Sequence, residues 1–356
     1  MIIYVSSLSS FIDDGCAKWF EDRGEDVALL GSLANDRFHI DTILDGKIKC
    51  CKAFMWDSGA VSVRNKKTEI KLSDYVGWVK EIHQTEIPLT IVALDVIGDV
   101  EASHRNYMDL KYSYGFGNNF LPVFHYGEHW SYLETLIEKE GFDYIGLGGV
   151  GAGDRLGQNS LRDWLKQVFF VDGNCKDIRY PGIKFHGFAM TSDITLPMFP
   201  FHSVDSATWV KNSANGRILT PYGDFRISND SRSGYDKLHF KRATPLKQQK
   251  VVEWIEAMGL TLDQVVNERY AKHIVNVNYF RWMEMKHNWN PAAYSDVSVL
   301  SDAVKSVDVK VKEKPKVSIK GLAKQESMVI PNTQTETIMV CPHCGKPVIL
   351  GITPKK

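Results

Sequence analysis

The sequence predicts an α/β protein: a (β/α)8 TIM barrel with a C-terminal helical appendage and a flexible tail. Short apolar runs rich in β-branched and aromatic residues recur as far as residue 208, and helix-like stretches separate them. Strands that alternate with helices favour a parallel sheet, and the number of runs matches the strands of a barrel. A doubly wound sheet is the alternative fold. Because no G-x-G-x-x-G segment follows an early run, its dinucleotide-binding version is disfavoured.

The predicted strands are the apolar runs themselves. Several lack a regular alternation of polar and apolar residues, which is typical of parallel strands buried on both faces. The runs occupy residues 2–7, 27–32, 53–59, 89–96, 120–127, 143–150, 183–190 and 201–208. His186 and His202 lie inside two of these runs and are therefore predicted to be core histidines.

Helix start signals lie between and after the predicted strands. An S-x-x-D or T-x-x-Q pair is typical of a capping box, and threonine before proline is typical of an N-cap and the first helical position. Such signals occur at Ser160 with Asp163, at Thr244 with Pro245, and at Thr261 with Gln264, the last opening a long helix towards Met285.

Four regions are predicted along the chain. Residues 1–230 form the barrel core and include a hairpin at 216–229, where two strand-like runs flank a turn. Residues 231–295 form a basic helical extension that completes the barrel. Residues 296–337 lose apolar periodicity, which predicts a flexible, lysine-rich linker. Residues 338–356 hold a short Cys-x-x-Cys knuckle.

The composition is that of a globular protein. Of 356 residues, 44% are hydrophobic and 24% are charged, which excludes a mostly disordered, collagen-like or coiled-coil chain. No apolar run approaches the ~18–20 residues that span a bilayer, and the first residues lack the basic and apolar regions of a signal peptide. Six cysteines are too few for a disulfide scaffold. We therefore expect a cytoplasmic protein with no membrane partner.

Charge is balanced overall but unevenly distributed. The formal net charge is zero, which argues against an indiscriminate nucleic-acid binder. Residues 211–250, however, carry nine lysines and arginines against three aspartates, and residues 305–324 carry seven lysines against two acids. These segments predict a polyanion bound on one side of the protein. A solvated surface and a soluble tail are the alternative.

Polar residues stand at the ends of several predicted strands, where a parallel barrel carries its catalytic groups. They are Asp57, Asp95, His125, the pair Gly148 and Gly149, and Asp205. A single aspartate in such a place is more often a helix cap or a turn residue. Three aspartates, a histidine and a glycine pair in this order favour an active site.

Five segments, in order, resemble motifs of the tRNA-guanine transglycosylases. MWDSGA (55–60) resembles the D-S-G-G segment, ALDVIGD (93–99) the strand with a base-binding aspartate, and GLGGVGAGD (146–154) the G-G-L-x-x-G-E loop. SVDSATW (203–209) matches the position of the nucleophilic aspartate, and GRILTPYGDFRI (216–227) is similar to the hairpin that follows it. The residues of these motifs are most similar to those of the phage and bacterial branch, the DNA 7-deazaguanine transglycosylases.

The resemblance implies a base exchange in which guanine in DNA is replaced by a 7-deazaguanine such as 7-cyano-7-deazaguanine. Asp205 would attack C1′ of the sugar and form a covalent intermediate, as in retaining glycoside hydrolysis. Asp57 would protonate the leaving base and deprotonate the incoming one. The base-binding groups would be Asp95, His125, Ser58, Gly148 and Gly149. The nucleic-acid-binding groups would be Arg217, Arg226, Arg232, Lys237, Lys241 and Arg242.

The resemblance also implies the partners. These are DNA, with tRNA as the alternative, a free 7-deazaguanine base, and a second copy of the chain in a homodimer. The target nucleotide must leave the base stack to be reached. No cofactor is required for the chemistry. The setting would be the cytoplasm of a prokaryotic cell or of a phage-infected host.

The sequence also departs in several places from the family that it resembles. Residues 230–290 contain no cysteine, so the family's structural zinc site after the hairpin is missing and a tRNA-type docking domain is disfavoured. His125 takes the place of a base-binding glutamine, and Ala60 takes the place of a glycine. A tRNA-guanine transglycosylase and a non-catalytic barrel subunit that binds a base or a nucleic acid remain alternatives. A metal-dependent hydrolase barrel ranks lower because no H-x-H ligand pair is present.

Cys341 and Cys344 form one half of a tetrahedral zinc site. Closure needs two more ligands, which His343, His273, His287 or another chain would supply. A structural zinc ion here is one interpretation, and a knuckle without metal in an exposed tail is the other.

Overall fold

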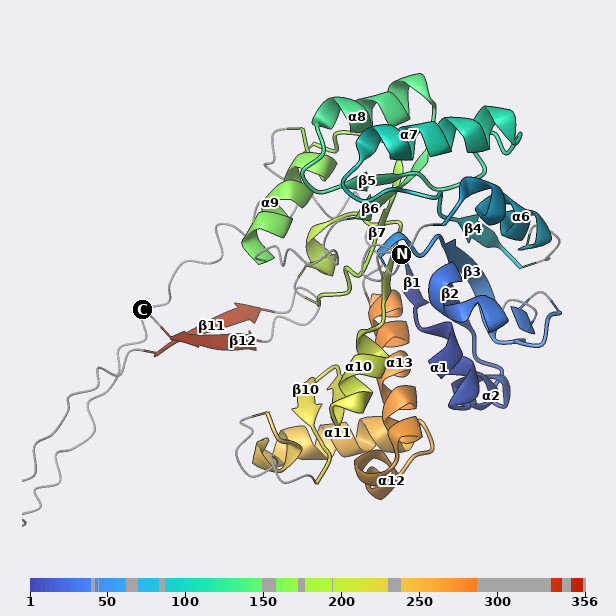
Figure 1. The fold of residues 1–356 in the computed structure, drawn as a ribbon. Coiled ribbons are helices and arrows are strands. Elements are labelled where there is room, and N and C mark those ends of the chain that lie inside the picture. The colour runs from blue at the N-terminus through green and yellow to red at the C-terminus, as the bar shows by residue number, and fades with distance from the viewer. Residues whose placement is uncertain are drawn as a thin grey trace, which may run out of the picture. The chain divides into compact units, whose positions relative to one another are not determined.

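A curled sheet of eight parallel strands forms the centre of the first part of the chain (Figure 1). Its strands are β1 (Ile2–Val5), β2 (Val27–Ser32), β3 (Cys51–Asp57), β4 (Leu89–Ile91), β5 (Val123–His125), β6 (Tyr144–Gly148), β7 (Lys184–Gly187) and β8 (Ser203–Ser206). Each strand overlaps one of the predicted apolar runs, so the predicted strands are confirmed. The fold is α/β and resembles a TIM barrel.

The computed structural model describes the following residues: 1–39, 42–43, 45–61, 70–82, 87–148, 158–171, 177–193, 195–229, 238–286, 334–340 and 347–354. The chain divides into two units, Met1–Ala293 and Tyr294–Lys356. The eight-stranded sheet belongs to the first unit, and a hairpin belongs to the second.

The order of the strands carries the sheet nearly around a closed circuit. Neighbours run β4-β3-β2-β1-β8-β7-β6-β5, with Tyr4 of β1 opposite Asp205 of β8. The two outer strands meet beyond β4, where a parallel bridge joins Val92 to Leu121. The Ala93 N–H donates to the Leu121 carbonyl at 2.8 Å, and the Leu121 N–H donates to the Ile91 carbonyl at 2.7 Å. We call this junction the seam.

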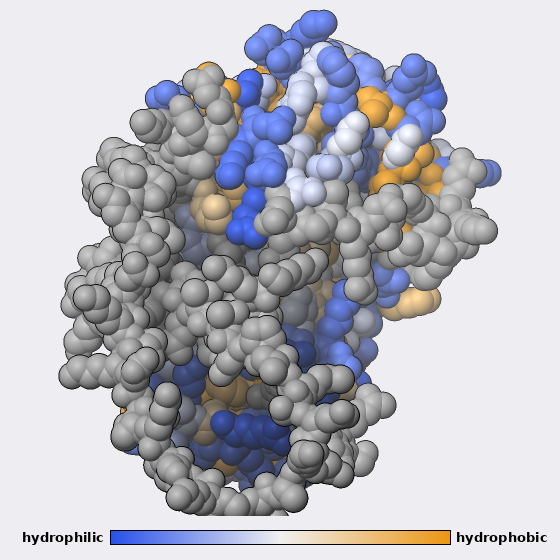
Figure 2. All heavy atoms as spheres, turned by 90° about the vertical axis from the view of Figure 1, so that its left-hand side faces the viewer, coloured by the Kyte–Doolittle hydropathy of each residue, from blue (hydrophilic) through white to orange (hydrophobic). Residues whose placement is uncertain are grey.

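Helices follow the strands, and Figure 1 shows α6 to α9 on the outside of strands β4 to β7. Within the described part of the first unit, the α-helices include α1 (Leu8–Asp13), α2 (Cys16–Glu21), α3 (Leu33–Asp36), α6 (Leu72–Ile82), α7 (Val100–Met108), α8 (Trp130–Glu134), α9 (Gln158–Phe169), α10 (Thr208–Ala214), α11 (Pro245–Ala257), α12 (Leu262–Asn267) and α13 (Arg269–Lys286). A single π-helical turn extends α7 over Asp109–Ser113 and another extends α8 over Thr135–Lys139. Figure 2 shows mostly hydrophilic side chains near the top of one face, at the height of α7 and α8.

Two of the predicted helix boundaries are wrong. Helix α9 begins at Gln158, two residues before Ser160. The helix predicted to run from Thr261 towards Met285 is broken at Glu268, whose backbone is extended (φ −103°, ψ 130°). The buried Lys272 ammonium donates at 3.1 Å to the carbonyls of Val266 and Glu268, and the contact with Val266 satisfies an acceptor that the break releases.

Two helix-start signals and the hairpin are confirmed. Thr244 caps α11 with Pro245 at its first position, and Thr261 forms a capping box with Gln264. The predicted hairpin consists of β9 (Arg217–Thr220) and β10 (Gly223–Arg226), paired antiparallel. Helix α13 packs against β9, α10 and β1.

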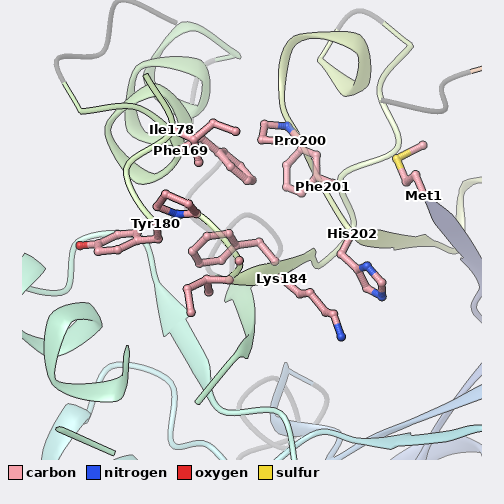
Figure 3. Close-up of a pocket in the computed structure, with 12 residues that line it drawn as sticks. Met1, Phe169, Ile178, Tyr180, Lys184, Pro200, Phe201 and His202 are labelled. Carbon is pink, nitrogen blue, oxygen red and sulfur yellow. The ribbon is translucent and has the colours of Figure 1, made fainter. Parts of the chain in front are cut away.

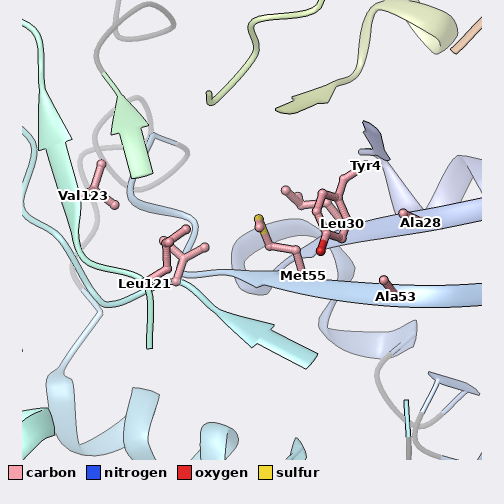
Figure 4. Packing of buried hydrophobic residues seen from close by; sticks show 8 residues of the cluster. Tyr4, Ala28, Leu30, Ala53, Met55, Leu121 and Val123 are labelled. Carbon is pink, nitrogen blue, oxygen red and sulfur yellow. The ribbon is translucent and has the colours of Figure 1, made fainter. Parts of the chain in front are cut away.

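A hydrophobic cluster fills the inside of the curled sheet. Side chains of a strand alternate between its two faces, so every second residue points inward. The cluster consists of Tyr4, Ala28, Leu30, Ala53, Met55, Val92, Leu121 and Val123. Figure 4 shows these side chains converging from β1, β2, β3 and the segment that leads into β5.

The second unit contains one hairpin among its described residues. β11 (Gln334–Val340) pairs antiparallel with β12 (Pro347–Pro354). β11 begins inside the range predicted to be linker. Cys341 and Cys344, the predicted zinc ligands, lie outside the described residues, as do His343 and His287.

Candidate active site

Polar side chains follow the inward-pointing cluster residues by two positions. Asp57 follows Met55, and His125 follows Val123. The period of two places each pair on the same face of the sheet, so these polar groups lie inside it, at the carboxyl ends of β3 and β5. Ser6 and Ser32 stand in the same relation to inward residues of β1 and β2. The inner face of the sheet therefore carries an apolar layer first and a polar layer at the carboxyl ends of the strands.

At the carboxyl ends of the strands, Asp57 has a strongly raised pKa. Burial raises the pKa of its carboxyl from 3.8 to about 7, and the negative charges of Asp95 and Asp205 add to this effect. The N–H of Gly59 and the hydroxyl of Ser32 act in the opposite direction. Asp57, Asp95 and Asp205 are therefore close enough to influence each other's charge. A carboxyl with a pKa this close to neutrality can both give and take a proton near pH 7.

Two donors hold the carboxylate of Asp205. The Ser6 hydroxyl donates to Oδ2 at 2.6 Å, and the Ala189 N–H donates to Oδ1 at 2.8 Å. Ala189 and Ser7, the residue after Ser6, have positive φ angles of 57° and 70°, and no other described non-glycine residue does. Such backbone strain persists only where surrounding contacts enforce it, and it concentrates at functional sites.

Asp95 and His125 form a buried pair. His125 Nε2 lies 3.0 Å from Asp95 Oδ2, and His125 Nδ1 lies 3.1 Å from Oε1 of Glu128. Burial alone would lower the pKa of His125, but hydrogen bonds and charges from both carboxylates outweigh it and raise the pKa to about 9. The imidazolium therefore orients Asp95 from one side. The Ser58 hydroxyl, which is fully buried, donates to Asp95 Oδ1 at 3.1 Å from the other.

Gly148 ends β6 directly beside His125. A Cβ atom at Gly148 would lie 2.9 Å from His125 Cδ2 and 3.0 Å from a methyl carbon of Val123. Only glycine therefore leaves room for the histidine ring in this position. Gly149, the second member of the predicted glycine pair, lies outside the described residues.

The predicted nucleic-acid-binding residues are partly described. The Arg217 guanidinium forms a double hydrogen bond with Asp224 across the hairpin, at 3.0 and 2.5 Å, so its charge is largely offset. Lys241 Nζ donates to Asn229 at 3.1 Å, and Lys241 and Arg242 are exposed. Arg226 is half-buried on β10. Arg232 and Lys237 lie outside the described residues.

Metal ligands do not gather in the described part of the chain. Among those residues, no group of three or more His, Cys, Asp or Glu side chains could hold a metal ion. His273, one of the candidates for the two further ligands of the knuckle, is fully buried in α13, with Nδ1 3.3 Å from Asp14.

The structure adds groups that the sequence interpretation missed. They are Ser6, Ala189, Glu128 and His186, all in contact with Asp205 or His125. Glu128 carried a usable signal, because it stands three residues after a strand-end histidine. Trp56 and Trp209, which flank the two key aspartates, are fully buried and pack in the core.

A separate cavity of about 320 Å³ lies at the opposite, amino-terminal edge of the sheet (Figure 3). Lys184, the first residue of β7, and His202, just before β8, contribute to its wall with Phe169 and Phe201. None of the predicted site residues lines it. The candidate active site is therefore defined by the strand ends and their hydrogen bonds.

No protein-family model matches the chain, and no curated protein matches it. Within the described residues, no helix has both the length and the apolar character needed to cross a membrane.

Proposed function

We propose that the protein is a DNA-guanine transglycosylase built on a complete (β/α)8 barrel. It exchanges guanine in DNA for a 7-deazaguanine base through a covalent Asp205–sugar intermediate. One observation carries the proposal: Asp57, Asp95 and Asp205 gather at the carboxyl ends of the strands, close enough for their charges, with burial, to raise the pKa of Asp57 to about 7. Base exchange at a glycosidic bond needs one carboxylate to attack the sugar and a second acid to handle the base's proton.

The two acids have environments that suit different roles. Asp205 is held by the Ser6 hydroxyl and the Ala189 N–H, which fix the carboxylate for attack on C1′. As the C1′–N9 bond breaks, its electron pair leaves with guanine, and Asp57 donates the proton that guanine needs. Asp57 then accepts the proton of the incoming base. A carboxyl with a pKa near the working pH serves both directions.

The Asp95, Ser58 and His125 cluster supports recognition of a guanine-like edge. An ionised carboxylate has about four lone-pair sites, and Asp95 uses one on each oxygen for Ser58 and His125. The remaining sites accept the N1–H and exocyclic N–H groups of the base. Glu128 and His125 hold Asp95 in that orientation.

The basic residues beyond the hairpin would bind phosphates. Lys241 and Arg242 are exposed on the turn of 3-10 helix at Phe240–Arg242. Binding through such residues weakens as the salt concentration rises, because the release of counterions from DNA then becomes less favourable. We place the reaction in the cytoplasm of a prokaryotic cell or of a phage-infected host.

The test is incubation of the purified full-length chain with duplex DNA and 7-cyano-7-deazaguanine, followed by mass spectrometry of the nucleosides. The wild type is expected to give a 7-deazaguanine deoxynucleoside. Asp205→Asn and Asp57→Asn are expected to give none. Asp143→Asn is the matched control, since Asp143 is exposed just before β6, at the other edge of the sheet.

Other outcomes identify the alternatives. Incorporation into tRNA but not into DNA would indicate a tRNA-guanine transglycosylase. Equal incorporation by the wild type and Asp205→Ala would mean that Asp205 is not the nucleophile, and binding of the base without any incorporation would indicate a non-catalytic, base-binding subunit. The absence of exchange in either nucleic acid would exclude the proposed reaction.

A further inference from the structure

Three polar side chains form a buried chain of contacts beneath Asp205. Tyr144 Oη lies 2.5 Å from Ser203 Oγ, and Ser203 Oγ lies 2.6 Å from His186 Nδ1. His186 and Ser203 are fully buried. His186 Nε2 has no hydrogen-bond partner in the structure and lies 3.5 Å from Asp205 Oδ1. The chain therefore ends in an unpartnered ring nitrogen that faces the carboxylate.

The order of donors along this chain follows from the carboxylate. An ionised carboxylate only accepts, so a bare Nε2 lone pair facing Asp205 would be repelled. A proton on Nε2 leaves Nδ1 of the neutral ring as an acceptor. Ser203 then donates to Nδ1, and the Tyr144 hydroxyl donates to Ser203. The Tyr144 phenol has a pKa raised by burial, so it keeps the proton that starts this series.

We propose that Tyr144, Ser203 and His186 act as a directional relay that presents the Nε2–H of His186 to Asp205. His186 is a positioning residue, and its role rests on the proposed transglycosylase function. Contacts that matter in a reaction are often long in the resting protein and shorten in the transition state. The His186 contact shortens when negative charge returns to Asp205.

That charge returns in the second half of the exchange. The C1′–Oδ bond breaks and its electron pair goes back to the Asp205 carboxylate. At the same time N9 of the incoming base attacks C1′ and passes its proton to Asp57. An N–H aimed at Asp205 stabilises the departing carboxylate but contributes little to the neutral ester. Removal of this N–H therefore slows breakdown of the covalent intermediate more than its formation.

Two substitutions test the roles of the two ring nitrogens of His186 separately. The glutamine amide nitrogen in His186→Gln replaces Nε2, whereas the shorter amide in His186→Asn reaches only the Ser203 side. Rapid quench would measure formation of the covalent DNA adduct, and a chase with 7-cyano-7-deazaguanine would measure its breakdown. Loss of one hydrogen bond to a charged group predicts about tenfold slower breakdown in His186→Asn, with the adduct accumulating. His186→Gln is expected to restore breakdown.

A second measurement tests the relay apart from the reaction. Nitrogen-15 NMR of histidine-labelled protein is expected to show His186 protonated on Nε2 only, with its signal assigned by its loss in His186→Gln. His104→Gln, on the outer helix α7, is the matched control for folding and rates. A proton on Nδ1, or equal slowing of both steps in the Asn and Gln variants, would overturn the relay. If the wild type forms no adduct, the proposed function fails, and the NMR result alone decides the hydrogen-bond order.

Discussion

Asp57 shows how position alone changes the chemistry of a common residue. Its place at the inner end of β3 removes it from water and sets it beside two other aspartates, which raises its pKa to about 7. Placing a group in such an environment costs stability, since burial disfavours the ionised form. A site of this kind is expected to be destabilising wherever the carboxyl is charged.

Asp57→Asn is expected to stabilise the protein at alkaline pH. The folded state holds the proton between pH 3.8 and about 7, whereas the unfolded chain releases it near 3.8. The contribution of Asp57 to stability is therefore fully present below pH 3.8, decreases as pH rises from 3.8, and is lost once pH has passed about 7. The loss amounts to at most about 4 kcal/mol. Urea unfolding of both proteins from pH 5 to 8.5 measures the difference. A constant gap across this range would mean that Asp57 has an ordinary pKa.

Glu128→Gln is expected to lower the pKa of His125. Two carboxylates now hold that pKa at about 9, and an amide keeps the shape of Glu128 while removing its charge. Loss of one opposite charge shifts a pKa by roughly 1–3 units. NMR titration of the His125 ring gives the value directly. Glu134→Gln on α8, where Glu134 is exposed, is the control and should leave it unchanged.

At the scale of elements, Asn276 joins three pieces of structure. This fully buried residue of α13 accepts from the Leu219 N–H of β9 at 2.6 Å. Its amide nitrogen donates to the Trp209 carbonyl of α10 at 3.0 Å and to the Arg217 carbonyl at 3.2 Å. Both α10 and β9 follow the strand that carries Asp205, so α13 fixes the chain just after the candidate site.

Asn276→Leu is expected to destabilise the protein by about 2–4 kcal/mol, because buried backbone donors and acceptors lose their partners. Denaturant unfolding measures the change. Asn267→Leu is the control, since the side chain of Asn267 is exposed and bonds only within α12. A loss below 1 kcal/mol for Asn276→Leu would contradict the joining role.

At the scale of the whole molecule, the strands of the sheet differ in how many backbone hydrogen bonds join them to their neighbours. Most neighbouring strands share ladders of paired residues, as in the pairing of β2 with β3 from Val27 to Ser32. The seam between β4 and β5 rests on one bridge and the two backbone hydrogen bonds around Leu121. All of these residues are buried, so the seam is weak in hydrogen bonds and not in burial.

The seam is expected to open first. Amide hydrogen exchange in the native protein should be at least about tenfold faster at Ala93 and Leu121 than at Leu29. Leu29 is an apt reference because it is equally buried and sits in β2, between two paired neighbours. Similar exchange at the three amides would show that the sheet opens as one unit.

The sequence predicted the strands well because buried parallel strands are short apolar runs between polar segments. β2 coincides with its run, 27–32, and Asp57 and Asp205 were visible as charged residues at the ends of such runs. β4 is shorter than its run, because the chain leaves the regular ladder at Val92 to form the seam.

The partners of the key aspartates could not be predicted in the same way. Ser6 is separated from Asp205 by 199 residues, and only the pairing of β1 with β8 brings them together. Ala189 contributes a backbone N–H in a left-handed conformation, which its residue type does not signal. The core prediction is confirmed for His186, which is buried, although the same position also turns its Nε2 towards Asp205. It is wrong for His202, which is half-buried.

The pairing of β1 with β8 has a consequence for biosynthesis. Residues 2–5 receive their second neighbour only when residues 203–206 have left the ribosome. At about 5–20 residues per second, this delay lasts roughly 10–40 s. During that time the nascent amino-terminal strand has one open flank, and such an edge attracts other chains. Chaperone dependence of production, more than stability of the finished protein, is where this architecture is expected to be vulnerable.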